Sequence, residues 1–171
     1  GLMNVVALCD VDPVSEYMQE AATGFPRAKV YRDWRKLFDE CVNEFDAGVV
    51  MVPDHSHFPV TMAAMALGKH VFTEKPLART FEEVSLMMAA AERYGVVTQM
   101  GNQGFSGDNY FQFKAWKEAG IIKNFRHIDG QINIGRSWIP HHTNPKYAVN
   151  ALPEGETKPR QLDWDGWLAA T

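Results

Sequence analysis

The sequence lacks the features that mark membrane, exported or nucleic-acid-binding proteins. No apolar run approaches the roughly 18 residues of a membrane span, and no signal or transit peptide is visible at the N-terminus. Lys and Arg number 17 against 21 Asp and Glu, which gives a net charge of −4. Nucleic acid binding requires a basic face, so this charge argues against it. No nucleic acid and no membrane is therefore expected among the partners.

Cysteine is also scarce, and the two cysteines do not form a recognisable pattern. Cys9 lies in an apolar, strand-like run, and Cys41 lies on an apolar helix face. Both are predicted to be buried thiols and not part of a disulfide framework. Histidines occur in pairs at 55 and 57 and at 141 and 142. Zinc requires three or four converging ligands, and nothing brings these pairs together, so no metal is predicted.

What the chain does contain is an alternation of strand and helix patterns. It has 171 residues, of which 46% are hydrophobic and 22% charged, as in a globular protein. Strands are predicted over residues 4–9, 30–32, 48–52, 70–73 and 96–100. Helices are predicted over 14–22, 34–45, 56–67 and 81–94, with Asp33 and Thr80 as N-caps and Gly95 as a stop. This order predicts βαβ units, hence an α/β fold with a parallel sheet.

The pattern changes after Gly104. A helix is predicted to end at Gly120, and a strand-like run extends over residues 125–134. From residue 135 onward the periodicity is lost. We therefore predict a first domain over residues 1–122 and the beginning of a second over 123–171.

The most informative feature is the tripeptide Glu74-Lys75-Pro76. It stands where the strand of residues 70–73 ends. Ligands of open α/β sheets bind outside the carboxyl ends of the strands. A lysine at that edge is able to pass a proton or polarise a hydroxyl, and a proline fixes the backbone beside it. A solvated surface charge pair is the alternative for this Glu-Lys pair.

These residues carry a resemblance to a known family. The chain resembles the glucose–fructose oxidoreductase / inositol dehydrogenase / MocA family of NAD(P)-dependent oxidoreductases. The matching segments, in the order of the family, are 7–13 (ALCDVDP), 52–57 (VPDHSH), 66–71 (ALGKHV), 74–76 (EKP), 99–103 (QMGNQ) and 162–168 (LDWDGWL). The resemblance implies a Rossmann-type doubly wound parallel sheet, followed by a second α/β domain.

The resemblance also implies a function and a set of site residues. Lys75 is expected to be catalytic, holding the reacting hydroxyl and its proton. The residues expected to contact the cofactor are Asp10, Pro53, Asp54, His57, Glu74, Lys75 and Asn102. Each of three residues has an alternative role. Asp10 could cap a helix, Glu74 could form an ion pair, and His57 could be a first-turn helix residue. Because a carboxylate at Asp10 repels a 2′-phosphate, NAD is expected in preference to NADP.

The departures from the family pattern are equally specific. A Rossmann fingerprint places its glycine loop about 20 residues before the ribose-binding acid, yet nine residues precede Asp10. The first strand and the glycine loop are therefore expected to be missing from this chain, and residues 123–171 are too few for the second domain. We read the chain as part of a longer protein, inactive alone. The strands near Val6 and Val50 should then not pair directly.

The predicted function is an NAD-dependent oxidoreductase that moves a hydride between nicotinamide and a sugar or polyol carbon. An NAD-dependent glycosidase-like relative and a catalytically silent sugar- or nucleotide-binding protein are the alternatives. A small carbohydrate or cyclitol is the expected substrate, and a homo-oligomer through the C-terminal domain is implied. The cytoplasm is the default compartment, while export to the periplasm stays open because a signal would precede Gly1.

Overall fold

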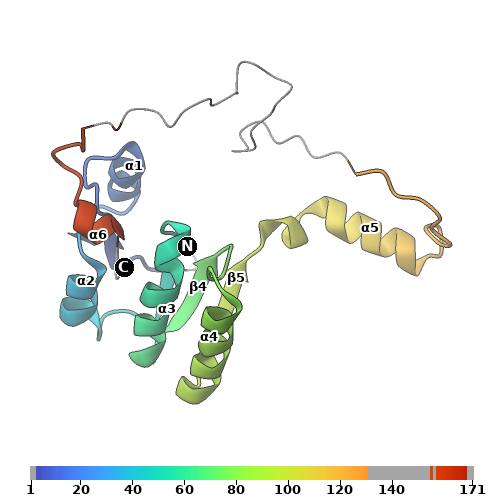
Figure 1. Ribbon diagram of the computed structural model, residues 1–171, viewed down its shortest axis with the longest axis horizontal. Helices are drawn as coiled ribbons and strands as arrows, with labels where there is room; N and C mark the ends of the chain where they lie inside the picture. Colours follow the sequence, from blue (N-terminus) through green and yellow to red (C-terminus); the bar gives the residue numbers. More distant parts are fainter. Residues whose placement is uncertain (1–2, 131–154, 156, 169–171) are drawn as a thin grey trace. The chain divides into compact units, whose positions relative to one another are not determined.

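The computed structural model describes residues 3–130, 155 and 157–168. Within them the strands are β1 (Ala7–Cys9), β2 (Lys29–Tyr31), β3 (Ala47–Val50), β4 (His70–Glu74) and β5 (Thr98–Gly101). The helices are α1 (Glu16–Gly24), α2 (Trp34–Cys41), α3 (His57–Ala66), α4 (Phe81–Tyr94), α5 (Asp108–Glu118) and α6 (Trp164–Leu168), with the 3-10 turns η1 (Asp54–Ser56) and η2 (Gln103–Ser106) (Figure 1). None of the helices described is both long and apolar enough to cross a membrane.

The strands form two parallel sheets. β1 pairs with β2, and β3, β4 and β5 pair in that order. Strand pairing of this kind, with helices between the strands, confirms the Rossmann-type α/β fold expected from the sequence. In the described part of the chain, β1 and β3 belong to separate sheets. Direct pairing between them, which would have contradicted the expected missing strand, is thus not observed.

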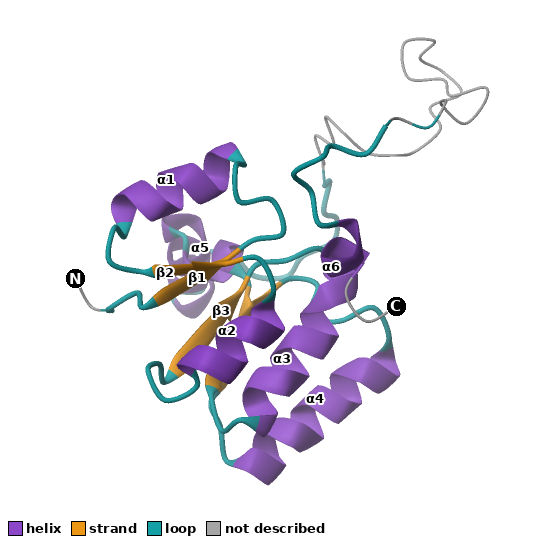
Figure 2. Cartoon of the chain, turned by 90° about the vertical axis from the view of Figure 1, so that its left-hand side faces the viewer, coloured by secondary structure: helices purple, strands orange, loops and turns teal. Residues whose placement is uncertain are grey.

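The core lies between the three-stranded sheet and two helices, α3 and α4, which lie side by side in Figure 2. Its buried residues are Val50, Val60, Ala64, Met65, Val71, Met87 and Ala90. Side chains alternate between the two faces of a strand. Val50 is accordingly buried, whereas Val49 and Met51 are 58% and 66% exposed. One face of β3 therefore packs against the core, and the other is open in the described part of the chain.

The helix ends follow the signals in the sequence. The side chain of Asp33 accepts a hydrogen bond from the Arg35 N–H and caps α2. Thr80 and Glu83 form a capping box at the start of α4, and Gly95 ends that helix with φ 65°. These three predictions are confirmed. The sequence could make them because a helix cap depends on residues only a few positions apart.

The chain divides into two compact units, Gly1–Gln103 with Lys158–Thr171, and Gly104–Thr157. The predicted boundary at 122/123 differs from this division, and the last residues join the first unit. In the first unit the Asp163 N–H donates to the Val11 carbonyl, which places α6 beside the end of β1 (Figure 1).

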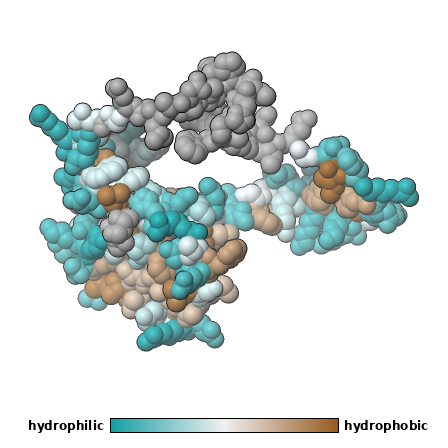
Figure 3. Space-filling view, in the orientation of Figure 1, coloured by the Kyte–Doolittle hydropathy of each residue, from teal (hydrophilic) through white to brown (hydrophobic). Residues whose placement is uncertain are grey.

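The second unit is described through α5 and residues 119–130. α5 confirms the helix predicted before Gly120, and its aromatic side chains Phe111, Phe113 and Trp116 are exposed. Figure 3 shows hydrophobic, brown atoms among hydrophilic ones on this unit. Residues 125–130 form no strand. The predicted strand is therefore wrong over that part, and its remainder, 131–134, lies outside the described residues.

Candidate active site

The residues that the sequence singled out gather at the ends of the parallel strands. Asp10 follows β1, Pro53 and Asp54 follow β3, Glu74 ends β4 and precedes Lys75, and Asn102 follows β5. The register pairs Glu74 with Gly101, so Lys75 and Asn102 begin neighbouring loops. Carboxyl ends of parallel strands are the ligand-binding edge of such sheets.

Asp10 is partly buried at the turn after β1. Its Oδ1 accepts a hydrogen bond of 2.8 Å from the Asp12 N–H, which orients the carboxylate. The turn thus holds a negative charge at the position where a Rossmann domain binds the adenosine ribose.

Cys9, next to Asp10, is an exposed residue, so the prediction of a buried thiol is wrong for Cys9 and confirmed for Cys41. The sulfur itself is nevertheless partly screened from water. Desolvation, then the carboxylates of Asp33 and Asp10, raise the pKa of Cys9 to about 12. The thiol therefore stays neutral, and carboxylates carry the charge at this corner.

Pro53 and Asp54 open the turn after β3. Both are exposed, and the Ser56 N–H donates to the Pro53 carbonyl at 2.8 Å, closing η1. Their exposure leaves the Asp54 carboxylate and the Pro53 ring accessible to a ligand at this edge.

Glu74 lies in a seat made by β5. Its Oε1 accepts a hydrogen bond of 2.5 Å from Nε2 of Gln103, and its Oε2 accepts one of 3.2 Å from the Lys75 N–H. A Cβ on Gly101 would lie 2.6 Å from Oε1 of Glu74, closer than real contacts allow. The carboxylate therefore occupies space that only a glycine at 101 leaves open.

Lys75 is exposed at the start of the loop after β4, and the Lys75–Pro76 peptide bond is cis. Asn102 is exposed at the start of the neighbouring loop. An amine and an amide side chain therefore stand at adjacent strand ends, beside the carboxylate of Glu74. Such a set can hydrogen-bond a polyhydroxylated ligand, and the amine can exchange a proton with it.

His57 lies apart from this accessible set. The residue is 1% exposed, and its two ring nitrogens lie 2.5 Å from the Pro76 carbonyl oxygen and 2.8 Å from the Val52 carbonyl oxygen. Neither nitrogen is left for a cofactor. The structure thus favours the alternative reading of a first-turn helix residue.

Two features of the site were not predicted from the sequence. The first is the hydrogen bond from Gln103 to Glu74. Gln103 is the last residue of the family-like segment 99–103, so that segment was a signal that could have identified it. The segment before and within α6 also reaches the strand ends: the Arg32 guanidinium donates to the Gln161 carbonyl, and Nε2 of His55 lies 2.7 Å from the Trp167 carbonyl. Contacts across more than a hundred residues leave no local signal.

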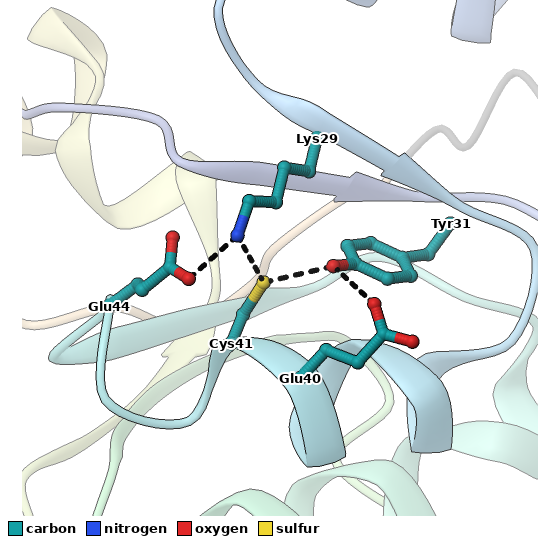
Figure 4. A network of polar contacts seen from close by, with 5 residues as sticks. All are labelled: Lys29, Tyr31, Glu40, Cys41 and Glu44. Atoms are coloured by element: carbon teal, nitrogen blue, oxygen red, sulfur yellow. Dashed lines mark hydrogen bonds and ion pairs between the residues drawn. The ribbon is translucent and has the colours of Figure 1, made fainter.

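A second polar cluster joins β2 to α2 (Figure 4). Lys29 forms an ion pair with Glu44 at 2.6 Å, and the Tyr31 hydroxyl bridges Glu40 and the Cys41 sulfur. The hydrogen bond to Glu44 is the main cause that raises the pKa of Lys29. Because these groups satisfy one another, the cluster fastens the helix to the strand and is not a candidate for chemistry.

No group of three His, Cys, Asp or Glu residues suited to a metal ion occurs in the part of the chain that the structure describes. His55 faces the Trp167 carbonyl, and the ring of Trp167 lies 4.8 Å from its own. The pair His141 and His142 lies outside the described residues.

Comparison with known proteins adds to this geometry. Residues 2–102 match a family described as "Oxidoreductase family, NAD-binding Rossmann fold". Inositol 2-dehydrogenase of Salmonella paratyphi B is 28% identical over 170 residues, 97% of this chain and 47% of that protein. The chain thus spans about half the length of this curated relative.

Solved structures are similar in fold. The structure of myo-inositol 2-dehydrogenase from Lactobacillus plantarum matches 68% of this chain and 34% of its own, with 28% identity and a TM-score of 0.61. The WlbA dehydrogenase from Bordetella pertussis, solved with NADH and UDP-GlcNAcA, matches 67% of this chain and 32% of its own, with 25% identity and a TM-score of 0.58.

Proposed function

The chain belongs to the Gfo/Idh/MocA oxidoreductase family with its NAD-binding Rossmann fold, and on this premise we propose that the whole protein is a sugar or cyclitol dehydrogenase. The observation that carries the proposal is the exposed Lys75, which directly follows Glu74 at the end of β4 and begins the loop next to that of Asn102. A carbohydrate or cyclitol as substrate is supported by the relatives named as inositol dehydrogenases. The homo-oligomer implied by the resemblance stays a prediction.

The residues present suit a dinucleotide. The oriented carboxylate of Asp10 would accept a hydrogen bond from the adenosine ribose, and Glu74 would accept one from the nicotinamide ribose. Pro53, Asp54 and Asn102 are exposed along the same edge and would line the path between them. When bound, NAD supplies the hydride acceptor.

Lys75 performs the proton chemistry in this proposal. Its Nζ takes the proton of the substrate hydroxyl as the carbinol carbon gives up its hydride, so the C–O single bond becomes a carbonyl. In the reverse direction the same Nζ returns the proton to the oxygen. The Lys75 N–H bond to Oε2 of Glu74 fixes the backbone from which the amine extends.

The test is Lys75→Ala in the full-length protein, with Lys36→Ala, an exposed lysine of α2, as the matched control. NADH formation measures turnover on the best substrate of a panel of sugars and cyclitols. In Lys75→Ala this turnover should fall roughly 10²–10⁴-fold. NAD affinity measured by calorimetry should change little. Near-native turnover of Lys75→Ala would show that Lys75 is only a surface charge and not a catalytic residue.

Two other results would favour the alternative functions. Tight NAD binding without turnover of any compound in the panel would indicate a binding protein. Release of a sugar from a glycoside without net NADH formation would indicate glycoside cleavage.

A further inference from the structure

Lys75 is preceded and followed by backbone anchors of different kinds. On its amino side, the Lys75 N–H donates to Glu74. On its carboxyl side, the Pro76 carbonyl oxygen lies 2.5 Å from Nδ1 of His57. Proline has no backbone N–H, so this carbonyl is the only backbone group of Pro76 that can form a hydrogen bond. His57 therefore contacts the one backbone group through which Pro76 can be held by a hydrogen bond.

The other ring nitrogen of His57 reaches the loop after the neighbouring strand. Nε2 lies 2.8 Å from the Val52 carbonyl oxygen, one residue before Pro53. One imidazole thus joins the two loops that would line the site, after β3 and after β4. Carbonyl oxygens only accept, so the ring nitrogen that carries the proton donates to the carbonyl that it faces.

The base of this bridge is rigid. His57 begins α3 and is 1% exposed. Thr61, one helical turn later and on the same face, forms a 2.8 Å hydrogen bond with the hydroxyl of Thr73 in β4, and both residues are buried. Val60, Ala64 and Met65 of the same helix lie in the core. The ring therefore projects from an element that is fixed to β4.

We propose that His57 is a positioning residue. Its Nδ1 contact with the Pro76 carbonyl fixes the position of the Lys75 backbone, so that the Lys75 amine can contact the substrate hydroxyl. It acts without touching cofactor or substrate. The inference rests on the role proposed above for Lys75. Displacement of a reacting group by about 1 Å costs up to about 100-fold in rate.

Two substitutions separate the two ring contacts. The amide nitrogen of Asn is attached to Cγ, as Nδ1 is, so His57→Asn keeps a donor toward Pro76. The amide nitrogen of Gln lies one atom further out, as Nε2 does, so His57→Gln keeps a donor toward Val52 alone. Each variant keeps one of the two ring contacts and gives up the other, so the two are matched in the number of buried contacts removed.

In the full-length protein, His57→Gln should lower kcat roughly 10–100-fold with NAD affinity nearly unchanged. His57→Asn should stay within about threefold of the unchanged enzyme. Thr61→Val, which removes another buried bond of α3, should also keep its kcat. Equal losses in the Asn and Gln variants, or a loss in Asn with Gln intact, would overturn the inference.

Hydrogen exchange provides a readout that does not depend on the chemistry. The amides of Lys75, Leu77 and Ala78 should exchange roughly tenfold faster in His57→Gln than in His57→Asn or Thr61→Val, because only the Gln variant releases Pro76. Unchanged exchange there would refute the bridge. If exchange follows this pattern while Lys75→Ala keeps its turnover, the bridge stands and the function proposed for Lys75 fails.

A double variant tests whether His57 acts through Lys75. In a Lys75→Ala background, adding His57→Gln should reduce kcat by less than about threefold, because the group being positioned is already absent. A full 10–100-fold further loss would show an effect independent of Lys75 and would contradict the positioning role.

Discussion

Single residues at the end of β1 set where negative charge resides. Cys9 and Asp10 are adjacent, and Asp33 lies close to the same sulfur. Loss of hydration around the sulfur, reinforced by the two carboxylates, raises the pKa of Cys9 to about 12. A thiolate would add a further negative charge beside Asp10, and the raised pKa prevents this at neutral pH.

This raised pKa predicts slow alkylation of Cys9. At pH 8 the thiolate is the minor form, so Cys9 should react with iodoacetamide roughly 100-fold more slowly than an ordinary exposed thiol. The rate should keep rising with pH well beyond pH 9. Asp33→Asn retains the N-cap of α2 but removes a charge, so it should speed the reaction.

Peptide mass spectrometry of the alkylated protein measures both cysteines at once. Cys41 is 0% exposed and provides the internal control, because it should react only after unfolding. Labelling of Cys9 at the rate of a free thiol at pH 8 would show that the sulfur is neither desolvated nor near the two carboxylates.

At the scale of elements, the contact between β4 and β5 determines how Glu74 is presented. The parallel register puts Glu74 beside Gly101, and Gln103, two residues further on, reaches back to Oε1. The end of β5 therefore supplies the space for the carboxylate, and the turn η2 after it supplies a donor. The side chain of Glu74 is ordered by its neighbouring strand before any ligand contacts it.

Gly101→Ala should displace this carboxylate. The added Cβ would overlap the carboxylate end of Glu74, a flexible group, so the loss in unfolding free energy should stay below about 1 kcal/mol. Losing the hydrogen bonds that hold Glu74 should weaken NAD binding roughly three- to tenfold. Calorimetric titration of the full-length protein measures the affinity, and thermal unfolding measures the stability.

Gly48→Ala is the matched control, a strand glycine of β3 with no atom within 4 Å of an added Cβ. It should leave NAD affinity unchanged. If Gly101→Ala leaves NAD affinity as unchanged as Gly48→Ala does, either Glu74 does not need the space beside Gly101 or Glu74 does not contact the cofactor.

At the scale of the whole molecule, the candidate site combines residues from two separate sheets. Asp10 belongs to the β1–β2 sheet, whereas Glu74, Lys75 and Asn102 belong to the β3–β4–β5 sheet. A dinucleotide, which carries two ribose groups, would use residues of both sheets in the proposed function. In the proposed function, the charge of Asp10 is what would repel the 2′-phosphate of NADP and so favour NAD.

Asp10→Asn should weaken the preference for NAD. Asn keeps the oxygen that accepts the Asp12 N–H but removes the charge that repels a 2′-phosphate. The ratio of NADP to NAD affinity in the full-length protein should rise by roughly tenfold or more. Asp12→Asn, a change of equal charge in the same turn, should not alter that ratio. An unchanged ratio in Asp10→Asn would remove Asp10 from the ribose site.

The sequence by itself determined the strands and helices of residues 7–94 and the edge at which the candidate site lies. Asp33, Thr80 and Gly95 place helix ends, because capping acts between residues a few positions apart. Apolar runs place the strands, and Lys75 and Asn102 follow them directly. Because parallel strands end at one edge, the sequence order alone was sufficient to bring these residues to that edge.

Only the tertiary structure decided which of those residues are accessible and what holds them. His57 and Asp54 are three residues apart and looked alike in sequence, yet His57 is buried against two carbonyls while Asp54 is exposed. The seat of Glu74 depends on a neighbouring strand, and the docking of α6 near Val11 depends on a segment about 150 residues away. Burial and hydrogen-bond partners of this kind arise from contacts between elements, which local sequence patterns do not specify.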